Sequence, residues 1–129
     1  MTVVARGAAP TPVVSVLPAT LNLALYAGDS VTVSFTFTDA SGNPLDMSGT
    51  WSAQVRSAPG AADPPLAVFG VDTTQAASGV IVISLDDEAT AALPIATTLA
   101  WDLEQQTGTD TVRTTHRGSV TVTEDVTRP

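Results

Sequence analysis

The stretch from residue 29 to residue 56 constrains the fold most, because two runs of alternating apolar and polar side chains flank a turn. A period of two is typical of a β-strand with one buried and one solvated face. The residues between the runs include Gly42, Asn43 and Pro44, which favour turns. The stretch therefore predicts two antiparallel strands, whose inward positions are Val31, Val33, Phe35, Phe37, Trp51, Ala53 and Val55.

The same pattern recurs along the chain between clusters of turn-forming residues, and it predicts seven strands. Acidic residues lead a short helical turn over residues 86–93, and Pro94 ends it. Gly70 and Gly118 are expected to interrupt their strands. We predict an all-β fold, an immunoglobulin-like antiparallel β-sandwich, with strands at about 20–26, 30–39, 50–57, 66–72, 80–85, 98–105 and 111–124.

The alternation also predicts which side chains form the core. Both tryptophans fall on the apolar face of a strand, which favours packing over a carbohydrate-binding platform. The predicted core residues are Phe35, Phe37, Trp51, Val55, Ile81, Ile83, Leu99, Trp101 and Leu103.

Residues 1–19 differ from the sandwich domain predicted over residues 20–129. Three prolines forbid a regular helix there and favour extended backbone. Two interpretations stay open, a disordered leader or an ordered arm that docks on a neighbouring subunit. In the second, residues 13–17 would add a strand to a sheet edge. The apolar residues of the arm are Val3, Val4, Val13, Val14, Val16 and Leu17.

Composition excludes several classes of protein. There is no cysteine, hence no disulfide and no thiolate metal site. A net charge of −8, with no lysine, disfavours nucleic acid as a partner. No apolar run approaches the length of a membrane helix, and the prolines leave no hydrophobic core for a signal peptide.

The residues that could carry chemistry do not form a recognisable site. His116 is the only histidine, and no strained serine turn accompanies it. The adjacent acidic residues 86–88 are typical of a helix start, and Asp39 and Asp46 flank a turn. We expect no enzyme activity, no cofactor and no metal.

One polar pair follows from the predicted strand order. If residues 50–57 and 98–105 are neighbours, Arg56 shares a solvated face with Asp102 and Glu104. We predict an ion pair between Arg56 and one of these two carboxylates, worth about 0–1 kcal/mol if exposed.

The order of motifs resembles a small domain common among tailed-phage structural proteins, related to the N-terminal domain of the baseplate upper protein. The motifs are a Gly28-Asp29 turn, a hairpin at Gly42–Gly49, and later Trp101-Asp-Leu103; Ala53-Gln-Val-Arg56, Thr90–Pro94, Arg117–Val120 and Asp125–Arg128 complete the order. The resemblance implies an immunoglobulin-like assembly module of the virion, made in the host cytoplasm.

The leading hypothesis is a non-enzymatic virion protein of the tail or baseplate that acts through arm docking and edge-strand contacts. Its expected partners are other virion proteins, or further copies of itself in a homo-oligomer or symmetric assembly. Capsid-exterior decoration is one alternative. A receptor- or carbohydrate-binding adhesion module is another, with the loops at residues 40–49, 58–65 and 73–79 as its rim.

Overall fold

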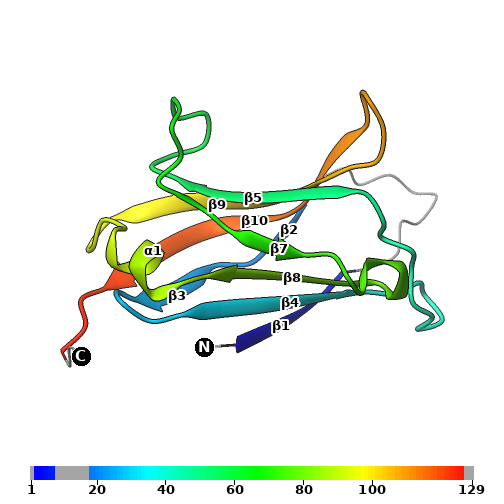
Figure 1. The fold of residues 1–129 in the computed structure, drawn as a ribbon, viewed down its shortest axis with the longest axis horizontal. Helices are drawn as coiled ribbons and strands as arrows, with labels where there is room; N and C mark the ends of the chain where they lie inside the picture. The colour runs from blue at the N-terminus through cyan, green and yellow to red at the C-terminus, as the bar shows by residue number, and fades with distance from the viewer. Residues whose placement is uncertain (1, 8–17, 127–129) are drawn as a thin grey trace.

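Two β-sheets packed face to face make up the fold (Figure 1). The computed structural model describes residues 2–7, as backbone, and residues 18–126. The first sheet has the order β1-β4-β8-β7, with β1 at Thr2–Gly7, β4 at Val31–Phe37, β8 at Val80–Leu85 and β7 at Gly70–Asp72. The predicted β-sandwich is confirmed.

The second sheet has six strands in the order β2-β10-β9-β5-β6, and β3 also pairs with β10. Its strands are β2 at Ala19–Thr20, β3 at Leu23–Tyr26, β5 at Thr50–Arg56, β6 at Ala67–Val68, β9 at Thr98–Gln106 and β10 at Val112–Thr123. β5 and β9 are antiparallel neighbours, as expected for the segments 50–57 and 98–105. Three pairings were not expected from the sequence, because β1 with β4, and β2 and β3 with β10, are all parallel.

The core fills the space between the sheets with the inward side chains of both. All nine side chains predicted for the core are buried, from fully covered Phe35 and Leu103 to Trp51 at 7% exposed. Phe35 and Phe37 pack against the two tryptophans, with ring centroids about 6 Å apart. Burial of these large apolar side chains is the main stabilising contribution to the fold.

The segment predicted as one strand over 66–72 serves both sheets. β6 pairs with β5 in the six-stranded sheet, whereas β7 pairs with β8 in the other. Phe69 lies between them and is buried, and its amide donates to the Ala53 carbonyl at 2.9 Å. The chain therefore crosses between the sheets just before Gly70, where a weak point was expected.

The predicted helical turn is α1, at Asp87–Ala91. Asp86 caps it by accepting a hydrogen bond from the Ala89 amide at 2.8 Å. Thr90 is fully buried, accepts from the Gly28 amide at 3.1 Å and donates to the Asp29 carbonyl at 2.8 Å. Because of these bonds, the turn between β3 and β4 is fixed to α1. A 3₁₀ turn, η1 (Ala76–Ser78), precedes β8.

β10 is irregular, but not where the sequence placed the interruption. Its register against β9 shifts between Thr114 and His116, while Gly118 stays paired with Trp101. Gly118 instead permits a close approach, because a Cβ there would collide with the Leu21 carbonyl and lie 2.9 Å from Asn22 Oδ1. The Leu21 carbonyl accepts a hydrogen bond from Trp101 Nε1 at 2.8 Å. Gly118 therefore lets the β2–β3 connection close over this edge of the sandwich.

The first residues of the predicted arm form a strand that pairs with the four-stranded sheet. Val3 and Val4 belong to β1, which runs parallel to β4 of the same chain over six consecutive register pairs. This segment is therefore a sheet strand. The three prolines that set residues 1–19 apart in the sequence all follow this strand and do not interrupt it. The remaining arm residues, Val13, Val14, Val16 and Leu17, lie outside the described residues.

Candidate interaction surfaces

The described residues contain neither a cluster of metal-binding side chains nor a membrane-spanning helix. Among residues 18–126, no three histidine, aspartate or glutamate side chains are placed to hold a metal ion. None of the helices in this part of the chain is long and apolar enough to span a membrane.

His116 is a core residue. Its side chain is 3% exposed and its ring centroid lies 4.6 Å from that of Phe35 and 5.7 Å from that of Phe37. Burial lowers the pKa of His116, since a charged imidazole would lose its hydration there. His116 is therefore neutral at pH 7, and its ring packs in the core against Phe35 and Phe37.

Both tryptophans are also structural. Trp51 Nε1 donates to the Met47 carbonyl at 2.8 Å, and Trp101 Nε1 donates to that of Leu21. Buried rings with satisfied N–H groups cannot stack on a sugar. The carbohydrate platform weighed from the sequence is therefore not built from these two side chains.

The three loops considered as an adhesion rim do not lie together. The loops at residues 40–49 and 73–79 meet at one end of the sandwich, where the Met47 amide donates to the Ala76 carbonyl at 2.9 Å. The loop at residues 58–65 rises from the opposite end (Figure 1). A single binding site cannot be formed from all three.

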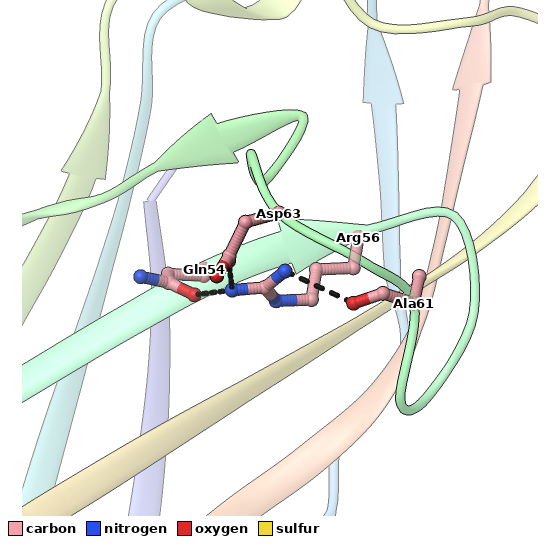
Figure 2. A network of polar contacts seen from close by, with 4 residues as sticks. All are labelled: Gln54, Arg56, Ala61 and Asp63. Carbon is pink, nitrogen blue, oxygen red and sulfur yellow. Dashed lines mark hydrogen bonds and ion pairs between the residues drawn. The ribbon is translucent and has the colours of Figure 1, made fainter.

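Arg56 pins the loop that follows β5, instead of pairing across the sheet (Figure 2). Its Nη2 contacts Asp63 Oδ1 at 2.6 Å and Gln54 Oε1 at 2.9 Å, and its Nη1 donates to the Ala61 carbonyl at 3.1 Å. The predicted ion pair with Asp102 or Glu104 is therefore wrong. In the register of the two strands, Arg56 lies opposite Ala100. The guanidinium is instead satisfied by the loop.

Asp102 nevertheless marks a charged row across the outer face of the six-stranded sheet. It lies opposite Gln54 on β5 and opposite Arg117 on β10. Burial raises the pKa of Asp102, and the charges of Arg56 and Arg117 offset part of that effect. This face therefore carries both signs of charge.

The outer face of the four-stranded sheet has a different character. Its central strands present only serine, threonine and valine there, all short and uncharged. These outward positions are Thr32, Ser34 and Thr36 of β4 and Val80, Val82 and Ser84 of β8. In a chain of net charge −8, this is a face on which another protein meets little electrostatic repulsion.

The sheet edges complete the candidate surfaces. β6 and β7 are edge strands of only two and three residues, and β6 carries the exposed Val68 beside Leu66. β1 is the longer edge strand of the four-stranded sheet. A strand of this length offers the unpaired backbone groups that edge-to-edge pairing uses.

The sequence resemblance has a counterpart among solved structures. No family model and no curated protein matches the chain. The chain is similar to the N-terminal domain of phage TP901-1 ORF48, with a TM-score of 0.51 and 14% identity, over 95% of this chain and 98% of that chain. At this identity the likeness is one of fold, so the chain shares its sandwich with a domain of a phage protein.

Proposed function

We propose that this chain is a non-enzymatic structural protein of a bacteriophage particle, an assembly module of the tail or baseplate. The observation that carries the proposal is the shared fold, which extends over nearly the whole of both chains. Fold alone does not determine function, so the positions of the motif residues supply the second support.

Residues of the motifs that resemble phage structural domains hold the turns and connections between strands. Thr90, from the Thr90–Pro94 motif, holds the Gly28-Asp29 turn. The Trp101 side chain, from the Trp101-Asp-Leu103 motif, holds the β2–β3 connection. Asp39, before the Gly42–Gly49 hairpin, accepts from the Ser41 and Asn43 amides at 2.9 Å. Residues in these roles maintain a scaffold, which suits a module whose function is contact with other proteins.

The module would act by surface contacts to other virion proteins and to further copies of itself. The uncharged face and the β1 edge are its two extended contact surfaces in the described residues. Symmetric repetition makes weak contacts sufficient through avidity. The acidic composition suits a position away from packaged DNA.

Localisation in the particle tests the proposal. Purified particles of the encoding phage are separated into heads and tails, and the chain is quantified in each by mass spectrometry and by gold-labelled antibody. We expect it in the tail fraction, at the baseplate. Label on the head surface would instead identify a capsid decoration protein, and absence from both fractions would reject a structural role.

A further inference from the structure

The edge of β4 opposite β8 pairs with one parallel strand. β8 covers one side of β4, and β1 covers the other, with Thr2 opposite Thr32 and Gly7 opposite Phe37. All four inward side chains of β4 are at most 3% exposed, so the strand is fixed in the core. Without β1, seven residues of rigid strand would present unpaired amides and carbonyls. The β4 edge therefore requires a pairing strand, and β1 shows that a parallel strand of six residues satisfies it.

The chain between β1 and β2 is longer than the gap it crosses. Gly7 lies beside Phe37, Ala19 lies beside His116, and the rings of Phe37 and His116 touch across the core. With strands about 4.8 Å apart and sheets about 10 Å apart, the gap is about 20 Å. Residues 8–18 supply twelve Cα steps, which can extend to about 40 Å. The connection therefore has length enough for β1 to reach a neighbouring molecule.

Charge favours a second copy as the source of the strand. Residues 1–17 contain Arg6 and no acidic residue, whereas residues 18–129 contain all thirteen acidic residues and only four arginines. The N-terminal segment is thus cationic and the rest of every copy is strongly anionic. Attraction between them offsets part of the repulsion between copies.

We propose that β1 is exchanged between copies, so that the β4 edge of one molecule takes Thr2–Gly7 of a neighbour in the same parallel register. In both forms β1 makes the same contacts with β4. The two forms differ mainly in the effective concentration of β1 near the β4 edge. A strand tethered within its own chain has an effective concentration of roughly millimolar order, so exchange competes when copies are equally crowded. The proposal rests on the proposed function in this respect, since a multi-copy particle crowds its subunits.

The absence of cysteine allows a direct test with the full-length chain. Val4→Cys and Ser34→Cys are made separately, because these two positions are register partners in β1 and β4. Adjacent strands bring Cα atoms within the distance that a disulfide spans. The purified variants are mixed at about 1 mM, a concentration comparable to that of a tethered strand, and then oxidised and analysed on non-reducing gels. We expect a disulfide-linked heterodimer joined at these two positions, identified by peptide mass.

Two controls make every outcome decisive. Val4→Cys mixed with Ser52→Cys, which is exposed on β5 of the other sheet, measures random collision. The double variant Val4→Cys/Ser34→Cys, at low concentration, should close within one chain. Closure there with no heterodimer above the collision control overturns exchange, and no closure at all overturns the register. Neither result touches the localisation experiment, which would still judge the proposed function.

Discussion

At the residue scale, the absence of a side chain at Gly118 allows the β2–β3 connection to lie close against β10. We predict that Gly118→Ala lowers the free energy of unfolding by about 1–3 kcal/mol, the usual cost of overpacking. The new Cβ would displace the Leu21 carbonyl from Trp101. Urea unfolding followed by tryptophan fluorescence measures this change. Gly108→Ala is the matched control, since the nearest atom to a Cβ there is 4.0 Å away, and equal losses would contradict the account.

The buried histidine makes stability depend on pH. Burial holds the folded pKa of His116 below its usual value of 6.5, so the unfolded chain binds a proton first as the pH falls. We expect the free energy of unfolding to fall as the pH decreases from 6.5 towards the folded pKa. Urea midpoints at pH 8, 6 and 5 measure it. His116→Phe should remove the part of the slope in this window, and an unchanged slope would assign it to other groups.

Asp102 gives the opposite sign in a more acidic window. Its raised pKa means that the folded state holds a proton more tightly than the unfolded chain, so this contribution is lost as the pH rises through the folded pKa. Asp39, Asp46 and Asp72 have lowered pKa values, because backbone and hydroxyl groups in their turns donate to them. Their contributions disappear as the pH falls below about 3.8. Comparison with His116→Phe therefore isolates the histidine.

Arg56 shows why a side-chain pair could not be predicted from strand order alone. The sequence placed Arg56 on the same face as Asp102, and β5 and β9 are indeed neighbours. The register and the path of the loop, which alternation does not encode, put Asp63 and the Ala61 carbonyl within reach. A long side chain with five donors takes the partners that local backbone presents.

At the scale of elements, α1 acts as a clamp on the β3–β4 turn. We predict that Thr90→Val lowers the free energy of unfolding by about 1–3 kcal/mol, because the Gly28 amide and the Asp29 carbonyl lose their partner, the buried Thr90 hydroxyl. Thermal unfolding measures the loss. Thr121→Val, at an exposed position of β10, should change little. If both variants behave alike, the hydroxyl of Thr90 does not clamp the turn.

Elements with strict alternation were predictable, and those set by tertiary pairing were not. The strand expected at 80–85 is β8 with the same bounds, because its pattern reads through from Val80 to Leu85. The segment 66–72 divides between sheets, a choice that depends on where β5 and β8 lie. β1 was missed because its six residues do not alternate between apolar and polar side chains and lie before a proline-rich stretch. Parallel pairing leaves no mark in alternation at all.

At the scale of the whole molecule, three sheet edges of the described residues are formed by short strands, and β1 lies along the fourth. Short strands limit pairing at β6 and β7, and β2 and β3 pair along β10. The remaining edge belongs to β4, a strand whose inward residues are all at most 3% exposed. Whatever strand occupies this edge, from the same chain or a neighbour, pairs with the backbone groups of β4 and so protects this rigid core strand from other partners.

This protection can be removed without shortening the chain. Val3→Pro/Ala5→Pro places two residues without amide donors in β1, and a proline is poorly tolerated in a ladder. We expect the variant to keep its far-ultraviolet circular dichroism, since the buried core lies in β3–β10, but to self-associate at concentrations where the parent scatters little light. Adding Ser34→Lys should suppress the association, because a charge beside a bare edge opposes strand pairing. Equal scattering by the parent and the proline variant would show that β1 does not protect the β4 edge.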